Sequence, residues 1–319
     1  MSDIKDLLNQ AITAVRNKEY QLGEHYCSQI ISLNPTIADA YNLLGIIYTE
    51  RKEFSKAIAA TRKAILCAPT NLTFQHNLGK LLFANNKDKE AITIFENIIK
   101  LQPLFYQAYF NLGKFYKKSQ QVEKARTLFI KAIEINPDFV PALNNLANIL
   151  QKENKLDEAL ALYEKALAVN PSFPEIHLNI GHINALKNKL DVAEKSFIFA
   201  IQLRANYWDA FLALGNLYTR TKQFAQAEKA YLQALAFNPV QIECLLQLGN
   251  IYRTNAEYEK AIRSFNKVIS IEPTNTPARI SLGIIYFAIA DHDNAKKQFQ
   301  EVLAIDSTNA ESKFGDRYK

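Results

Sequence analysis

The feature that most constrains the fold of this chain is a proline that returns every 34 residues. Prolines stand at positions 35, 69, 103, 137, 171, 239 and 273. The interval is 34 each time or, between 171 and 239, twice that, with Ala205 at the missing place. A fixed period of this size predicts a repeat architecture, in which each repeat buries its apolar face against its neighbours and no single central core forms.

The period divides the chain into repeats of equal length. With the proline at position 32 of each repeat, nine repeats start at residues 4, 38, 72, 106, 140, 174, 208, 242 and 276. We therefore expect one array over residues 1–309. A short carboxyl-terminal tail, residues 310–319, follows it and is interpreted as a truncated cap.

Small and large residues alternate at fixed positions of the repeat. Position 8 is small throughout: Ala11, Gly45, Gly79, Gly113, Ala147, Gly181, Gly215, Gly249 and Gly283. Position 20 is small as well, with Gly23 and then Ala57, Ala91, Ala125, Ala159, Ala193, Ala227, Ala261 and Ala295. Position 24 is aromatic in Phe95, Phe129, Tyr163, Phe197, Tyr231, Phe265 and Phe299. We expect these rings to fill the spaces that the small residues leave.

Apolar periodicity predicts two helices in each repeat. Between positions 1 and 14, and again between 18 and 31, apolar residues recur at intervals of three and four, which is typical of amphipathic helices. The proline ends the second helix because it has no backbone N–H and forces the preceding residue out of the helical region. Each repeat is therefore expected to be an antiparallel helix pair.

The combined pattern resembles a known family. Tyrosine occupies position 11 in five repeats: Tyr48, Tyr116, Tyr218, Tyr252 and Tyr286. Together with the small residues, the position-24 ring and the proline, this pattern resembles the tetratricopeptide repeat over residues 4–309. The resemblance implies an all-α fold, a right-handed superhelical α-α solenoid of helix hairpins, in which the first helices line a concave face.

Departures from the pattern predict one loosely specified junction and one contact surface. Repeat 6 has Asn184 in place of tyrosine and Ala205 in place of proline, so we expect the junction between repeats 6 and 7 to be the least tightly specified. In repeat 9, Ile280, Ile284 and Phe287 put apolar side chains at positions of the inner face. They are interpreted as a surface that contacts another domain or subunit.

No motif for catalysis or metal binding is present in the sequence. It lacks a GxSxG, P-loop, HExxH or GxGxxG motif, so we expect no enzyme activity, no cofactor and no metal. His177 and His182 differ by five positions, which splays them around a helix.

Cysteine usage and apolar runs predict a cytoplasmic protein. Three cysteines, at 27, 67 and 244, match no disulfide framework, and Cys27 and Cys67 are expected in the core. The amino terminus MSDIKDLLNQ has no apolar stretch of a secretory signal. The longest apolar run, residues 282–290, is too short to cross a bilayer.

Asparagines recur where the resemblance places the inner face, at positions 2, 5, 6, 9, 12 and 13. Position 6 holds Asn77, Asn111, Asn145 and Asn179 in consecutive repeats, and position 9 holds Asn148, Asn216 and Asn250. An asparagine amide offers one acceptor and one donor group, so it can pair with a peptide unit of an extended ligand. The ladder is similar to that of O-linked N-acetylglucosamine transferases. Alternatively, asparagine at position 6 is only common in the family and has no role here.

Lysines predict the charge of the ligand. The chain carries 38 Lys and Arg against 32 Asp and Glu, a net charge of +6. The inner positions of repeats 3 to 5 hold Lys80, Lys114, Lys117, Lys118 and Lys152 and no acidic residue. Acidic residues stand on either side, at Asp39, Glu50, Glu175, Asp209 and Glu243. The middle of the inner face should therefore favour carboxylates, unless the lysines are only solvated.

Apolar residues mark position 5 of the later repeats. They are Leu178, Leu212, Leu246 and Ile280. This stripe either receives apolar side chains of the ligand or packs between neighbouring first helices.

Three functions remain open from the sequence. The first is a non-enzymatic scaffold that binds an extended, partly acidic peptide or disordered protein segment. The second is the substrate-recognition arm of a larger enzyme, a glycosyltransferase or sulfotransferase. The third is RNA binding through Phe83 and Phe110 between lysines, which we regard as the weakest because both rings could serve in helix packing. No membrane partner is expected.

Overall fold

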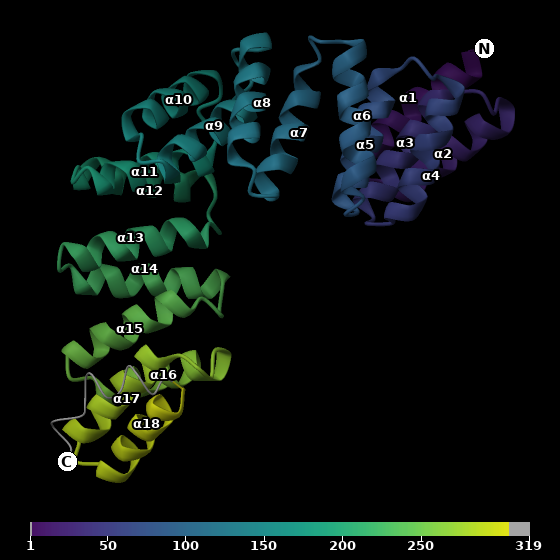
Figure 1. The fold of residues 1–319 in the computed structure, drawn as a ribbon. Helices are drawn as coiled ribbons and strands as arrows, with labels where there is room; N and C mark the ends of the chain where they lie inside the picture. The colour runs from purple at the N-terminus through teal and green to yellow at the C-terminus, as the bar shows by residue number, and fades with distance from the viewer. Residues whose placement is uncertain (1, 306–319) are drawn as a thin grey trace. The chain divides into compact units, whose positions relative to one another are not determined.

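A computed structural model describes residues 2–305, and every regular element in that range is an α-helix (Figure 1). The first helices of the repeats are α1 (Ser2–Arg16), α3 (Ala38–Glu50), α5 (Leu72–Ala84), α7 (Tyr106–Lys118), α9 (Val140–Lys152), α11 (Pro174–Leu186), α13 (Trp208–Arg220), α15 (Ile242–Thr254) and α17 (Thr276–Ala288). The second helices are α2 (Tyr20–Leu33), α4 (Phe54–Cys67), α6 (Asp88–Leu101), α8 (Val122–Ile135), α10 (Leu156–Val169), α12 (Leu190–Leu203), α14 (Phe224–Phe237), α16 (Tyr258–Ile271) and α18 (His292–Ile305).

The helices pack in the order of the chain. Each first helix contacts the second helix of its own repeat, which confirms the predicted all-α solenoid of helix hairpins. The structure divides into two compact units, one that ends at Val169 and one that begins at Asn170. That residues 1–309 act as one array stays a prediction, and the predicted tail over 310–319 lies outside the described residues. No helix among residues 2–305 is long and apolar enough to cross a bilayer.

The turn inside each hairpin has the same backbone geometry in all nine repeats. The second helices begin at position 17, one residue earlier than predicted. Position 15 is left-handed each time, with φ between 57° and 63°, and it is never glycine. In repeat 2 the N–H of Glu53 donates to the carbonyl of Tyr48 at 2.8 Å, and that of Lys52 to the carbonyl of Thr49 at 2.9 Å. This pair of bonds is a Schellman motif, which satisfies the last carbonyls of the first helix.

The small and large positions pack as predicted. A Cβ built on Gly79 would lie 2.8 Å from the ring of Phe95, and one on Gly113 would lie 2.8 Å from the ring of Phe129. Such distances are shorter than real Cβ contacts, so the ring lies directly on the glycine backbone. The position-24 ring therefore sets how closely the two helices of a repeat approach.

Tyrosine at position 11 joins one repeat to the previous one. The Tyr48 hydroxyl donates to Glu24 of repeat 1 at 2.8 Å, and the Tyr252 hydroxyl donates to Glu228 of repeat 7 at 2.8 Å. Burial and the neighbouring carboxylate raise the pKa of Tyr48 to about 12. The tyrosine therefore stays a donor over the physiological range and fixes the register between repeats.

The junction between repeats 6 and 7 keeps side-chain contacts despite its departures from the pattern. It lies inside the second compact unit. The Tyr218 hydroxyl donates to Glu194 at 2.6 Å, and Arg220 donates to the carbonyl of Ala185 at 2.7 Å. Arg204, before the missing proline, still has extended backbone, with φ −140° and ψ 96°. That this junction is the least tightly specified stays a prediction.

Candidate functional site

The predicted site residues of repeats 3 to 5 come together in the first compact unit. We call this set the polar wall: Asn77, Lys80, Asn111, Lys114, Lys117, Lys118, Asn145, Asn148 and Lys152 on α5, α7 and α9. Their first helices are joined side by side by hydrogen bonds, so the set forms one continuous face. Asn179, Asn216 and Asn250 belong to the second unit, on α11, α13 and α15.

The position-6 asparagines brace neighbouring repeats. The side-chain NH2 of Asn77 donates to the Oδ1 of Asn42, at position 5 of the preceding repeat, at 3.1 Å. The NH2 of Asn111 lies 2.8 Å from the Nε2 of His76, again at position 5 of the preceding repeat, and 2.9 Å from the carbonyl of Gln107. The ladder hypothesis required each amide to offer both its NH2 and its Oδ1 to a ligand. The NH2 groups of Asn77 and Asn111 are already used within the protein.

His76 is held neutral by its surroundings. Burial, together with the charge of Lys80, lowers the pKa of His76 to about 4. A neutral imidazole with its proton on Nδ1 can accept at Nε2, which fits a hydrogen bond from the NH2 of Asn111. The proton position is inferred from this bond. The pair is a fixed brace between α5 and α7.

Asn145 is braced in another way, because position 5 of the preceding repeat is Phe110 and cannot accept. Its Oδ1 accepts from the ammonium of Lys117 at 2.8 Å, and its NH2 donates to the carbonyl of Pro141 at 2.8 Å. Burial lowers the pKa of Lys117, and the neighbouring charges of Lys152 and Lys114 lower it further. Three cations thus crowd this part of the polar wall.

The position-9 asparagines bind ring hydroxyls of their own repeats. The Tyr163 hydroxyl donates to the Oδ1 of Asn148 at 2.6 Å. The Tyr231 hydroxyl donates to the Oδ1 of Asn216 at 2.7 Å, and the NH2 of Asn216 donates to Glu243 at 2.8 Å. These amides hold the position-24 tyrosines, a role that the sequence analysis missed although both residue types were present in it.

The two phenylalanines considered for RNA binding are engaged within the protein. Lys114 lies 5.7 Å from the centre of the Phe110 ring, and Lys118 lies 5.1 Å from that of Phe83. Phe110 also packs edge-on against Phe139, with ring centres 5.1 Å apart. Both rings are half-buried, so neither presents an open face for a base.

The remaining predicted positions have mostly packing contacts. Leu178 is buried in the core of the second unit, and Leu212 and Leu246 pack against core residues, which favours the packing interpretation of the position-5 stripe. On α17, Ile284 is 40% exposed and Phe287 is 49% exposed, while Ile280 is half-buried. A partner surface there stays a prediction.

Two of the three free thiols lie in the core. Cys27 and Cys244 are buried. Cys67 is exposed, contrary to the prediction, because position 30 is the last residue of α4. Its Sγ contacts the carbonyl of Pro35 at 3.8 Å.

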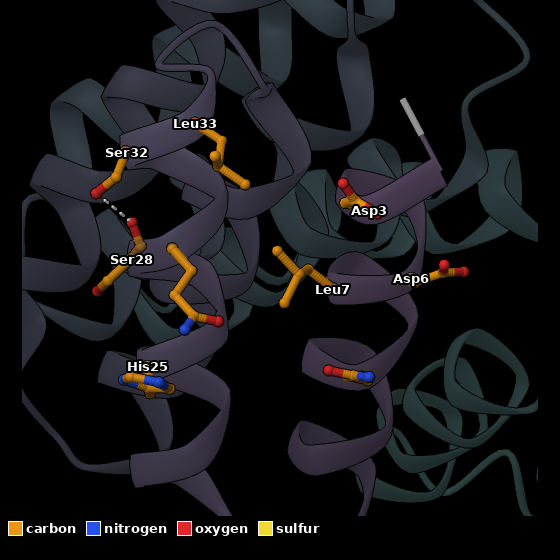
Figure 2. A pocket seen from close by; sticks show the side chains of 9 residues that line it. Asp3, Asp6, Leu7, His25, Ser28, Ser32 and Leu33 are labelled. Carbon is orange, nitrogen blue, oxygen red and sulfur yellow. Dashed lines mark hydrogen bonds between the residues drawn. The ribbon is translucent and has the colours of Figure 1, made fainter.

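Two cavities of the first unit differ in their relation to the polar wall. One of about 690 Å³ lies between α1 and α2, where Leu7 and His25 line it and Ser32 donates to the carbonyl of Ser28 at 2.9 Å (Figure 2). It contains no residue of the polar wall. Another, of about 260 Å³, includes Asn77 and Lys80 in its lining and therefore opens on the polar wall itself.

Comparisons with known proteins agree with the repeat pattern. Family models of the tetratricopeptide repeat match residues 8–71, 72–103, 106–139, 140–173, 209–241, 242–275 and 276–309. These ranges cover most of the sequence. The chain therefore belongs to the tetratricopeptide repeat family.

Two curated relatives match about a third of the chain. One is tetratricopeptide repeat protein 37 of Xenopus laevis, 29% identical over 102 residues, which are 31% of this chain and 6% of that protein. The other is small glutamine-rich tetratricopeptide repeat-containing protein 2 of Saccharomyces cerevisiae, 26% identical over 98 residues, 31% of this chain and 28% of that protein. The matches thus span a small part of each relative.

Two solved structures share the fold. The APC/C hetero-tetramer Cut9-Hcn1 matches with a TM-score of 0.59 and 19% identity over 91% of this chain and 57% of that one. PilF of Pseudomonas aeruginosa matches with a TM-score of 0.59 and 22% identity over 66% of this chain and 96% of that one. These neighbours show the fold, and membership of the tetratricopeptide repeat family supports a protein-protein interaction scaffold.

Proposed function

We propose that this chain is a non-enzymatic scaffold that binds an extended, partly acidic polypeptide segment along the polar wall. The observation that carries the proposal is the crowding of Lys114, Lys117 and Lys152. Burial lowers the pKa of Lys117, and the charges of Lys152 and Lys114 lower it further. Like charges held together are relieved when an anion binds among them. The proposal places the protein in the cytoplasm, which fits its three free thiols.

The lysines of the polar wall are available for such an anion. Among the described residues, Lys80, Lys114, Lys117, Lys118 and Lys152 form no ion pair with a carboxylate. Two of them lie over aromatic rings, and Lys117 is held by Asn145. A carboxylate would therefore gain a cation without first breaking an ion pair.

The asparagines have a smaller part in the proposal than in the ladder hypothesis. The NH2 groups of Asn77 and Asn111 bind the preceding repeat, but among residues 2–305 the Oδ1 atoms of these two residues accept no hydrogen bond. Each can accept from one peptide N–H of the ligand. Replacing Asn111 would also remove the partner of His76, so an asparagine substitution mixes binding with stability.

The lysines of the polar wall are the target of the test. Because Lys117 also donates to Asn145, the thermal unfolding of the lysine variant is compared with that of the wild type. A fluorescein-labelled peptide in which glutamates alternate with glycines is titrated with the protein at low salt, and anisotropy is measured. The variant Lys114→Gln/Lys117→Gln/Lys152→Gln should bind about tenfold more weakly. The matched control, Lys89→Gln/Lys100→Gln/Lys165→Gln, removes three exposed lysines from α6 and α10 of the same unit and should bind nearly as the wild type.

Equal loss in the two variants would mean that only net charge matters, and the proposal would then be wrong. The same peptide with glutamine in place of glutamate should bind more weakly than the acidic one. Its affinity should also depend less on salt.

A further inference from the structure

The cavity of about 260 Å³ lies in the first compact unit, between α3, α4 and α5. Its lining residues are Asn42, Gly45, Ile46, Thr49, Glu50, Thr61, Asn77, Lys80, Leu81 and Ala84. Glu50, Lys80 and Ala84 are exposed, while Gly45, Thr61 and Leu81 are buried. The cavity therefore has an exposed rim on the polar wall and a buried floor.

The floor of this cavity departs from the repeat pattern. Thr61 stands at position 24 of repeat 2, where most repeats have an aromatic ring over a small residue. It is 1% exposed, and its hydroxyl donates to the carbonyl of Ala57 at 2.9 Å. Thr61 covers Gly45 with its Oγ1 and, farther away, its Cβ, whereas Phe95 covers Gly79 with three ring atoms. The ring that stands at position 24 of repeats 3 to 9 is absent here.

The tyrosine repeats show where the missing ring would lie. The Tyr163 hydroxyl reaches Asn148 at position 9 and Gln151 at position 12 of its own first helix. The Tyr231 hydroxyl reaches positions 9 and 12 in the same way. In repeat 2 those positions are Ile46 and Thr49, and both line the cavity. The cavity thus occupies the volume that the ring of position 24 fills in repeats 5 and 7.

The equivalent place in repeats 6 and 7 is an internal control. A cavity of about 130 Å³ there is lined by His182, Ala185, Phe197, Ala213, Asn216, Leu217 and Arg220. These residues stand at the repeat positions that line the cavity of repeats 2 and 3, but Phe197 replaces the threonine. With the ring present, the cavity has half the volume and does not reach the glycine at position 8.

We propose that the cavity of repeats 2 and 3 binds an aromatic side chain of the polypeptide that lies on the polar wall. Its volume exceeds the ~150 Å³ of an apolar cavity that takes up benzene. Ile46, Leu81 and Ala84 supply apolar surface, and Ile46 is 36% exposed. That the occupant is a polypeptide side chain depends on the proposed function, whereas the fit of an aromatic ring does not.

The rim connects the cavity to the proposed acidic ligand. Lys80 lies on it and belongs to the polar wall, so a residue next to the aromatic one would meet a cation. Asn77, held by Asn42, presents an Oδ1 that can accept from a phenol hydroxyl or a peptide N–H. The cavity thus combines an apolar interior with a polar mouth, as sites for a single anchoring side chain do.

A small aromatic probe tests the cavity independently of the polar wall. p-Cresol is titrated into the full chain, and the amide of Gly45 and the methyl groups of Ile46 and Thr49 are followed by NMR. We expect saturable shifts with a dissociation constant on the order of millimolar. Thr61→Phe should abolish them because the protein's own ring takes the place. The matched control Thr93→Phe adds a ring on the exposed face of α6 and should leave them unchanged.

A second variant guards against misfolding of Thr61→Phe. Ala84 is exposed on the rim, so Ala84→Phe covers the mouth without disturbing the core. It should also abolish the shifts, with the same circular dichroism spectrum as the wild type. Absence of p-cresol binding to the wild type, or binding that persists in both variants, would overturn the proposal and leave the proposed function untouched.

Peptides then test the occupant. The acidic peptide is made with one tyrosine at either end and, as a control, with alanine there. One tyrosine peptide should bind about tenfold more tightly than the alanine peptide, and Thr61→Phe should remove that gain. The triple lysine variant should lose peptide affinity but keep p-cresol binding, so failure of the polar wall and failure of the cavity give different results. Tyrosine peptides that bind no better than alanine peptides would contradict the inference.

Discussion

Repeats 2 and 6 differ at position 24, and the difference decides what their inner faces can do. In repeat 6, Phe197 lies on Gly181 and leaves a cavity of about 130 Å³. In repeat 2, Thr61 lies on Gly45 and leaves about 260 Å³. The helices of repeat 2 begin and end at the same repeat positions as those of repeat 6. A tetratricopeptide hairpin therefore tolerates the loss of its central ring, and a surface cavity results.

The strongest test of this comparison exchanges the residue in the other direction. Phe197→Thr should open a cavity in repeat 6 and destabilise the second unit by about 3 kcal/mol, because Phe197 is 1% exposed. Urea unfolding followed by fluorescence of Trp208, the single tryptophan of the chain, reports on that unit. Phe199→Thr, on the same helix but 43% exposed, is the control and should cost much less.

The next largest difference is expected when one methyl group is added at position 8 of each repeat. A Cβ on Gly181 would lie under 3.0 Å from several ring atoms of Phe197, so Gly181→Ala should destabilise the protein by about 1–2 kcal/mol. On Gly45 the Cβ would lie that close only to the Oγ1 of Thr61, which must rotate away and give up its hydrogen bond to the carbonyl of Ala57. The gain in helix propensity of about 1 kcal/mol should then leave Gly45→Ala near neutral. Thermal unfolding of both variants measures the contrast, and equal effects would refute it.

Filling the cavity of repeat 2 should have a smaller, opposite effect. Thr61→Phe supplies the ring seen in repeats 3 to 9 and should stabilise the first unit by about 1 kcal/mol. The gain is limited because Thr61 gives up its bond to Ala57 and the ring must fit beside Ile46. A higher urea midpoint, by circular dichroism, is the expected result. A large loss of stability would mean that the backbone of repeat 2 is not shaped for a ring.

Acid sensitivity is the mildest expected difference between the two inner faces. The pKa of His76 in the fold is about 4, below its ordinary 6.5, so the unfolded chain binds more protons between these values. Stability from His76 is therefore complete above pH 6.5 and is lost as pH falls towards 4. His76→Gln keeps an acceptor for Asn111 and should flatten this part of the pH profile of the melting temperature. His182, whose pKa is lowered by burial alone, should matter less because no neighbour like Lys80 adds to it.

Much of the fold could be predicted because its signals repeat. The small residue at position 8 recurs in all nine repeats, and the proline at position 32 and the ring at position 24 recur in seven each. The ring and the small residue contact each other within one hairpin. The predicted end of each first helix and start of each second helix were wrong by one residue. The Schellman turn between them is fixed by backbone hydrogen bonds, which have no side-chain pattern in the sequence. Local, repeated interactions are therefore read well from one sequence.

The site was harder to predict, because its side chains depend on the neighbouring repeat. Whether Asn111 is free for a ligand is decided by His76, which stands 35 positions earlier and can accept its hydrogen bond. Thr61 went unremarked in the sequence analysis, and the volume that it leaves depends on how Ile46 and Leu81 pack. Inner-face residues can thus be placed by position, but their partners require coordinates.

The left-handed residue of every hairpin turn is a position at which the protein could be stabilised by substitution. Lysine, asparagine, glutamine or alanine occupies this place, although glycine adopts such a φ without strain. Each exchange to glycine should raise the free energy of unfolding by about 0.5–1 kcal/mol, and the gain should be smallest where asparagine is replaced. Because the turns share no partners, these increments should add up. Either end of the molecule could then be stiffened separately, with the polar wall and its cavity unaltered.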